Sequence, residues 1–307
     1  MRVALIGNSN AVFPLLDWLH AQGLLVGVAA TEQDNEFFKN FEAVCQQKQI
    51  TANIFKKKSI TKQIKDWLEN LNANIVLVLG FSYKIRKEIL VLPKLGFFNI
   101  HFGKLPKYGG GHPVFWQIKN QETQATLTIH QMDEEYDTGP IAFEINFDLN
   151  PQANHAMLDL NYGYLTINGV YFLLDAILKN ALTLTPQSNQ NSVFYSKPSL
   201  KDIIIHWQTM SAPEIMALIK ACNPWNNGAI ARINGMDLKI LEASIKNMPT
   251  TKAGEIINID ENQIEVSCIN DTAISIKAIY STIGFLVGES LMSLGINKGD
   301  VFETIPI

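Results

Sequence analysis

The chain has 307 residues, of which 47% are hydrophobic and 18% are charged, and its formal net charge is −4 at pH 7. That length favours two domains over one, and the composition is ordinary for a globular protein. A weakly acidic chain has no overall attraction for nucleic acid or anionic membranes, and no apolar run reaches the roughly 20 residues that span a bilayer.

The cysteines and the N-terminal residues indicate the compartment. Cys45, Cys222 and Cys268 are scattered and show no C-x-x-C spacing, which argues against a disulfide framework and against a zinc ribbon. The chain begins with a strand-like apolar run and lacks the basic segment, apolar core and cleavage site of a signal peptide. We therefore expect a cytoplasmic protein with reduced thiols and no membrane partner.

The first 80 residues alternate apolar runs with helix-like segments. Residues 3–6, 26–30 and 75–79 read as buried strands, and a helix-like segment precedes Gly23. Apolar residues at helical spacing in 60–71 predict another helix. Strands that are apolar on both faces and separated by helices predict an α/β domain with a parallel sheet, in which ligands bind beyond the carboxyl ends of strands.

The next 100 residues continue this domain. We expect helices at 112–120 and 154–179, with strands at 126–132 and 141–147 between them. The turn at residues 7–10 lacks the G-x-G-x-x-G fingerprint and the phosphate-loop lysine, which argues against a dinucleotide or nucleoside-triphosphate site.

The composition changes after the expected helix at 154–179. Residues 183–200 are rich in Thr, Pro, Gln, Ser and Asn, which predicts a linker. Ser211 and Glu214 have capping-box spacing, so a helix begins there, and Pro224 stops it. Short strand-like runs follow at close spacing and predict a small antiparallel barrel or sandwich. The expected organisation is a domain at 1–182, a linker at 183–204 and a smaller domain at 205–307.

The stretch from residue 96 to residue 111 is the candidate site. Asn99 and His101 alternate with Phe98 and Ile100 along a short strand, so the amide and the imidazole share one face. A glycine-rich loop follows, where backbone can approach a ligand closely. A second turn, rich in carboxylates, contains Asp137. We expect Asn99, His101 and Asp137 to meet in one site.

Each of these residues also has a plain structural interpretation. A lone histidine is more often structural than catalytic, buried amides commonly cap backbone groups, and Asp-Thr-Gly is prone to turns by itself. His112 and His130 do not have the close sequence spacing with His101 that metal ligands usually show. The position of His112 at the start of a helix and of His130 on a strand gives each a structural explanation. We therefore predict no metal site.

Together, an amide, an imidazole and a carboxylate suit acyl or formyl transfer to an amine. The attacking amine must lose a proton, the tetrahedral oxyanion must be stabilised, and the leaving nitrogen must gain a proton. The amide can donate to the oxyanion, the imidazole can move protons, and the carboxylate tunes the charge of the imidazole. Direct attack by the acceptor needs no nucleophilic Ser or Cys.

At these residues the sequence resembles the 10-formyltetrahydrofolate-dependent formyltransferase family. The N-x-H motif of that family and its proline-containing loop stand here as Asn99-Ile100-His101 and Leu105-Pro106, and its D-x-G turn as Asp137-Thr138-Gly139. The C-terminal part, with Asn223-Pro224-Trp225 among its markers, resembles the small barrel domain of methionyl-tRNA formyltransferases. The resemblance implies a Rossmann-like parallel-sheet domain followed by an OB-like β-barrel.

The resemblance also implies roles. Asn99 and His101 would polarise the formyl carbonyl of 10-formyltetrahydrofolate and hold its oxyanion, and Asp137 would keep His101 suitably charged and relay protons through water. The folate would lie against two loops, at Gly80, Phe81, Ser82, Tyr83, Ile85, Asp133 and Tyr136.

The sequence leaves two classes of acceptor open. The family's usual S-L-L-P and K-Y-R-G segments are Gly103-Lys104-Leu105-Pro106 and Lys107-Tyr108-Gly109-Gly110 here, which removes an arginine. Residues 201–307 hold 8 Lys/Arg and 12 Asp/Glu, whereas a domain that clamps tRNA should present a basic face. The acceptor is either methionyl-tRNA, which this charge does not favour, or a small amine such as a nucleotide-linked amino sugar. A 10-formyltetrahydrofolate hydrolase and a non-catalytic folate-binding module are the alternatives.

Overall fold

The computed structural model describes residues 1–33, 35–188, 190, 192–249 and 251–306. The chain divides into two compact units. Unit 1 comprises Met1–Pro113, Gln124–Asp148 and Asp159–Tyr195, and unit 2 comprises Val114–Thr123, Leu149–Leu158 and Ser196–Ile307. Among the described residues, none of the helices combines the length and apolar character that a bilayer span needs.

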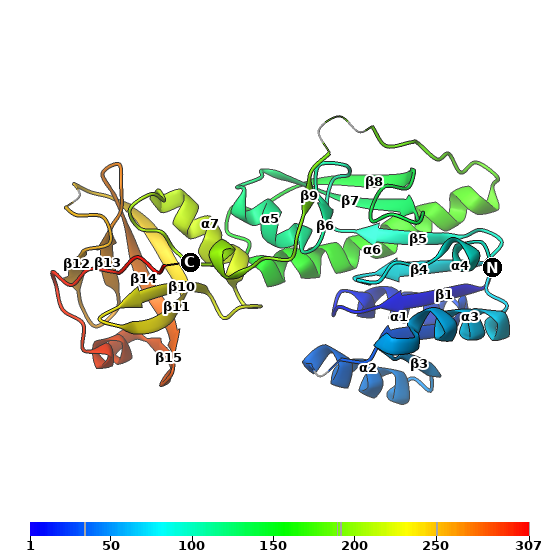
Figure 1. The fold of residues 1–307 in the computed structure, drawn as a ribbon, viewed down its shortest axis with the longest axis horizontal. Helices are drawn as coiled ribbons and strands as arrows, with labels where there is room; N and C mark the ends of the chain where they lie inside the picture. The colour runs from blue at the N-terminus through cyan, green and yellow to red at the C-terminus, as the bar shows by residue number, and fades with distance from the viewer. Residues whose placement is uncertain (34, 189, 191, 250, 307) are drawn as a thin grey trace. The chain divides into compact units, whose positions relative to one another are not determined.

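Unit 1 is built on a 7-stranded sheet in the order β3-β2-β1-β4-β5-β7-β8 (Figure 1). Neighbours from β3 to β5 are parallel, as the apolar runs predict, but β7 and β8 are antiparallel additions. The loop between β7 and β8 is too short for a crossover, so it forces a hairpin. The strands are β1 (Val3–Gly7), β2 (Leu25–Thr31), β3 (Ala52–Phe55), β4 (Ile75–Leu79), β5 (Phe97–His101), β7 (Gln124–Gln131) and β8 (Ile141–Asp148).

Helices cover this sheet because each presents an apolar stripe. On α3, Ile60, Ile64, Trp67 and Leu68 are buried in the same cluster as alternate residues of β1 and β4. Burying each such side chain contributes about 1.5–3 kcal/mol. The helices are α1 (Val12–Ala21), α2 (Glu36–Gln47), α3 (Ile60–Leu71), α4 (Lys87–Leu90) and α6 (His155–Leu178), with the 3-10 turn η1 (Lys57–Ser59).

The elements α2, β3 and α4 were not among those expected from the sequence. Asn35 caps the N-terminus of α2, since its side chain accepts a hydrogen bond from the Phe38 N–H, and the helix buries Phe37, Phe41 and Cys45. A spacing of four between buried residues is typical of a helix, but charged and amide residues lie between them, so the apolar periodicity of this segment is weak. With four residues, β3 is too short for a clear alternation.

A two-stranded ribbon lies beside the candidate site in unit 1. After β5 the chain forms β6 (Gly109–Gly110), which pairs in parallel with β9 (Phe194–Tyr195). An added Cβ on Gly110 would lie 2.2 Å from the Tyr195 carbonyl oxygen, so only glycine allows this approach. The ribbon fixes the glycine-rich loop against the segment that precedes unit 2 in the chain.

Unit 2 contains an antiparallel sheet in the order β10-β11-β14-β13-β12, and β15 pairs with β14. The expected capping box is present, because the Ser211 N–H donates to a Glu214 carboxylate oxygen at 2.7 Å where α7 begins. The strands are β10 (Ala229–Ile233), β11 (Met236–Asn247), β12 (Ile256–Ile259), β13 (Ile264–Ser267), β14 (Thr272–Ser281) and β15 (Gly284–Val287). The helices are α5 (Pro113–Lys119) and α7 (Ala212–Cys222), with the 3-10 turns η2 (Leu200–Asp202) and η3 (Gly288–Leu294).

Candidate active site

The structure brings Asn99, His101 and Asp137 together. Asn99 and His101 lie on one face at the carboxyl end of β5, and Asp137 lies in the loop between β7 and β8. The Asn99 amide nitrogen Nδ2 donates to Asp137 Oδ1 at 3.1 Å, and His101 Nδ1 is 3.6 Å from that oxygen. One carboxylate oxygen therefore joins the amide and the imidazole.

The loop that carries Asp137 is tightly constrained. Asp137 adopts a left-handed backbone conformation with φ of 57°, which an aspartate tolerates better than most residues. At Gly139 an added Cβ would lie 1.8 Å from the Gln131 carbonyl oxygen, so no side chain fits there. The Gly110 N–H of β6 donates to Asp137 Oδ2 at 2.8 Å and fixes the other end of the carboxylate.

The orientation of His101 follows from its backbone partner. His101 Nε2 is 2.6 Å from the Tyr108 carbonyl oxygen, which only accepts hydrogen bonds, so Nε2 carries a hydrogen. This leaves Nδ1 facing the carboxylate of Asp137. Burial lowers the pKa of His101, although the charge of Asp137 and the Tyr108 carbonyl act in the opposite direction. The neutral ring thus offers Nδ1 as a base beside an anion.

The carboxylate of Asp137 is held in its ionised form. Burial opposes ionisation, but His101, the hydrogen bond from His130 and the Gly110 N–H outweigh it and hold the pKa of Asp137 well below its usual range. In the part of the chain that the structure describes, no group of three or more His, Cys, Asp or Glu side chains could hold a metal ion.

His130 is a site residue that the sequence analysis assigned to a structural role. It lies on β7 directly opposite Asn99 in the antiparallel register. Its Nε2 is 3.1 Å from Asn99 Nδ2 and 3.4 Å from Asp137 Oδ1, and its Nδ1 is 3.2 Å from the Gln131 carbonyl oxygen. His101 and His130 are 6% and 2% exposed, so two buried imidazoles face one carboxylate.

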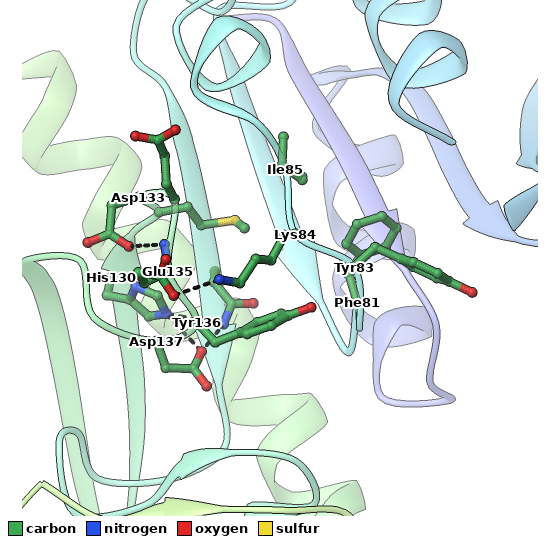
Figure 2. A pocket seen from close by; sticks show the side chains of 12 residues that line it. Phe81, Tyr83, Lys84, Ile85, His130, Asp133, Glu135, Tyr136 and Asp137 are labelled. Carbon is green, nitrogen blue, oxygen red and sulfur yellow. Dashed lines mark hydrogen bonds and ion pairs between the residues drawn. The ribbon is translucent and has the colours of Figure 1, made fainter. Parts of the chain in front are cut away.

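A pocket lies in front of these groups, between the loop after β4 and the loop after β7 (Figure 2). Asn99, His130 and Asp137 line it, together with the apolar side chains of Phe81 and Ile85. His101 is not in the lining, but its Nδ1 lies behind the lining residue Asp137, 3.6 Å from Oδ1. The remaining lining residues are Tyr83, Lys84, Met132, Asp133, Glu134, Glu135 and Tyr136.

The expected folate contacts fall on these two loops. Phe81, Tyr83, Ile85, Asp133 and Tyr136 line the pocket, whereas Gly80 and Ser82 do not. The Ser82 carbonyl instead accepts a hydrogen bond from the Tyr136 hydroxyl at 3.1 Å. Lys84 Nζ pairs with Glu135 Oε2 at 2.6 Å, so two contacts tie the loops together across the pocket.

Gln187 supports the turn from behind. Its side-chain N–H groups donate to the carbonyl oxygens of Asp137 and Gly139 at 2.8 and 2.7 Å. Gln187 lies in the segment read as a linker from its composition, and only the return of the chain toward β6 places it here. We infer that it is a positioning residue for the carboxylate.

Replacing Gln187 with alanine should lower kcat about tenfold with little change in the KM for the donor, because the left-handed turn at Asp137 loses both supports. Gln187→Glu keeps the shape but offers carboxylate oxygens to two carbonyls, so it should be no better. Steady-state kinetics, measured at a temperature at which both variants are folded, would give kcat and KM for each. Loss of thermal stability with an unchanged kcat would contradict the positioning role.

Comparison with known proteins identifies the family of this chain. The family model described as "Formyl transferase" matches residues 1–159, and "Formyl transferase, C-terminal domain" matches residues 199–282. A methionyl-tRNA formyltransferase from Clostridioides difficile (strain 630) is 32% identical over 259 residues, which cover 80% of this chain and 78% of the relative. The chain belongs to the formyltransferase family.

Two solved structures share the fold. An N-formyltransferase from Helicobacter canadensis, in complex with folinic acid and dTDP-3-aminofucose, superposes with a TM-score of 0.66 at 20% identity, covering 90% of this chain and 98% of that chain. HypX from Aquifex aeolicus, in complex with tetrahydrofolic acid, also gives 0.66, at 16% identity, and covers 99% of this chain but 51% of its own.

Proposed function

We propose that this formyltransferase moves a formyl group from 10-formyltetrahydrofolate to a primary amine by direct attack, using Asn99, His101 and Asp137. The convergence of one amide and two imidazoles on the ionised carboxylate of Asp137, at the floor of a pocket, is the observation that carries the proposal. Such a cluster can polarise a carbonyl and move protons without a nucleophilic side chain.

The pocket suits a folate. Its walls offer the rings of Phe81 and Tyr83 and the side chain of Ile85 to a flat heteroaromatic ring, and its far side offers acidic and backbone groups at residues 133–137. Apolar walls with a few convergent polar groups are the usual composition of such a site. When bound there, the donor supplies the formyl group, and the chain supplies the groups that hold and orient it.

The three residues have distinct tasks in this proposal. Asn99 lines the pocket and would donate an N–H of its amide to the carbonyl oxygen as charge develops, a contribution of about 100- to 1,000-fold in rate. Its Nδ2 donates to Asp137 Oδ1 in this structure, so an N–H of the amide must turn toward the substrate. As the amine nitrogen bonds to the formyl carbon, Asp137 would accept the amine's proton through water and share it with His101 Nδ1. The same proton would then pass to the leaving nitrogen of the folate as its bond to the formyl carbon breaks, which releases tetrahydrofolate.

The acceptor has two candidates, each favoured by a different observation. The relative from Clostridioides difficile is a methionyl-tRNA formyltransferase, which favours methionyl-tRNA. Residues 201–307 carry 12 acidic and 8 basic residues, and two of those cations, Arg232 and Lys246, are paired with Asp237 and Glu265, which favours a small amine. A nucleotide-linked amino sugar represents the second class.

The test follows tetrahydrofolate release from 10-formyltetrahydrofolate with methionyl-tRNA, with a dTDP-linked amino sugar and with no amine. Release that needs one of the two amines identifies the acceptor class. If methionyl-tRNA is the acceptor, the binding of tRNA should also weaken steeply as the salt concentration rises. Release without any amine would favour a hydrolase. Tight donor binding without release would favour a non-catalytic folate-binding module and overturn the proposal.

A further inference from the structure

The helix α6 is apolar on both of its faces. It has 24 residues, and the side toward the sheet buries residues such as Tyr162, whose hydroxyl donates to the Thr126 carbonyl of β7. The opposite side carries a stripe of five large side chains that are between 49% and 68% exposed, although the solvent face of a surface helix is normally polar. We call the set the α6 stripe: Leu160, Tyr164, Tyr171, Phe172 and Leu178.

The spacing of the α6 stripe is that of a helix–helix seam. Tyr164, Tyr171 and Leu178 are seven residues apart, and Leu160 lies four residues before Tyr164, so these side chains follow one line along the helix. Apolar side chains with this seven-residue spacing usually pack against a second helix, but here they are exposed to solvent. This seam therefore lacks its second helix within unit 1.

The aromatic part of the stripe is already ordered. The Phe172 ring stacks on Phe143 of β8 with ring centroids 5.4 Å apart, and it contacts the Tyr171 ring edge-on at 5.5 Å. Side chains held in this way lose little rotamer entropy when a partner covers them. Tyrosine and phenylalanine are also the side chains that are enriched at protein interfaces.

The charge of the stripe argues against a lipid or nucleic-acid partner. Between residues 160 and 178 the sequence has one charged residue, Asp175, and its carboxylate is paired with Lys179 Nζ at 2.7 Å. Helices that lie on membranes carry Lys and Arg on the face opposite their apolar one, and here that opposite face is buried in unit 1. A protein surface is the occupant that fits.

We propose that the α6 stripe is the interface of a homodimer, in which α6 packs antiparallel against α6 of a second copy of this chain. A two-fold axis near Asn168 would set Tyr164 of one protomer against Tyr171 and Phe172 of the other, so the stripe is complementary to itself, as an isologous interface requires. Asn168 would face its own copy at the axis and fix the register, as a single polar residue does in coiled coils.

The exposed area is sufficient for such a dimer. At their exposed fractions the five side chains present roughly 600 Å², taking about 200 Å² for one large side chain. A standard interface buries about 800 Å² per partner, and the largest apolar patch of a typical monomer is about 300–600 Å². Neighbouring residues such as Asn161, Asn168 and Phe143 would supply the remainder.

The first measurement is the mass of the full chain in solution. Sedimentation equilibrium from roughly 1 to 100 µM should show a mass that approaches twice the 34.3 kDa of one chain. Tyr164→Lys and Tyr171→Lys should each weaken association about 100-fold, because each places a charge in the centre of the seam. Phe285→Lys, at a residue of β15 that is 65% exposed, is the matched control and should leave the dimer intact.

A cross-link gives a second readout that does not depend on the stability of the lysine variants. Cys45, Cys222 and Cys268 are buried, so Asn168→Cys adds an exposed thiol close to the proposed axis. Mild oxidation should give a disulfide-linked dimer with Asn168→Cys and little with Glu69→Cys on α3. A wild-type chain that stays monomeric, a dimer that both lysine variants leave intact, or binding to neutral lipid vesicles without dimerisation would overturn the proposal.

Discussion

Replacing Asp137 with asparagine should lower kcat about 1,000-fold or more while the chain still folds. The side chain keeps its shape, but the anion that faces His101, His130 and the Gly110 N–H is gone. A proton arriving on His101 would then have no counter-charge in a buried site, where electrostatic stabilisation is large. Single-turnover measurement of tetrahydrofolate release would report the chemical step.

The same substitution should change the pH dependence in a defined direction. The charge of Asp137 raises the pKa of His101 against the effect of burial, so its loss should lower the pKa of His101 further. The imidazole would then stay neutral to lower pH in Asp137→Asn than in the wild-type chain, which NMR titration of the histidines would detect. Glu144→Gln, at an exposed residue of β8, is the control and should retain wild-type turnover. Turnover of Asp137→Asn within about tenfold of wild type would remove the carboxylate from the mechanism.

The β5 part of the site could be predicted from the sequence because alternation along a strand is a local property. Asn99 and His101 share a face whatever surrounds the strand. Asp137 was expected in the site from its carboxylate-rich turn, but the position of its carboxylate was not predictable from the Asp-Thr-Gly turn alone, and the resemblance to a family supported the expectation. The fold class was predictable for the same local reason, because apolar runs and helical spacing define the parallel part of the sheet.

His130 and Gln187 could not be placed by the same means. His130 joins the site through the antiparallel register that sets it opposite Asn99, and register depends on tertiary context. Gln187 joins it because the chain returns beside β6 after α6, in a segment whose composition reads as a linker. A search for polar residues on the strand next to β5 would have found His130, whereas no local signal marks Gln187.

Replacing His101 with glutamine should lower kcat about 100- to 1,000-fold. Glutamine can still donate to the Tyr108 carbonyl, which His101 Nε2 contacts at 2.6 Å, so the loop keeps its anchor. It cannot accept a proton at the position of Nδ1, which is the function that we propose for the ring beside Asp137. The variant thereby removes proton acceptance by the ring but keeps its support of the loop. His101→Ala would remove both at once.

The pH profile of kcat distinguishes these two contributions. Because burial lowers the pKa of His101 below its ordinary value of about 6.5, the ring is neutral at pH 7 and becomes protonated only in more acidic solution. Wild-type activity should therefore fall on the acid side of pH 6.5, and that limb should vanish in His101→Gln. His20→Gln, at an exposed residue of α1, should keep both the rate and the limb. If the fall in activity at acid pH persists unchanged in His101→Gln, another group titrates in that range and His101 only supports the loop. A residue with a purely structural role changes the rate, but it does not change the pH at which activity falls.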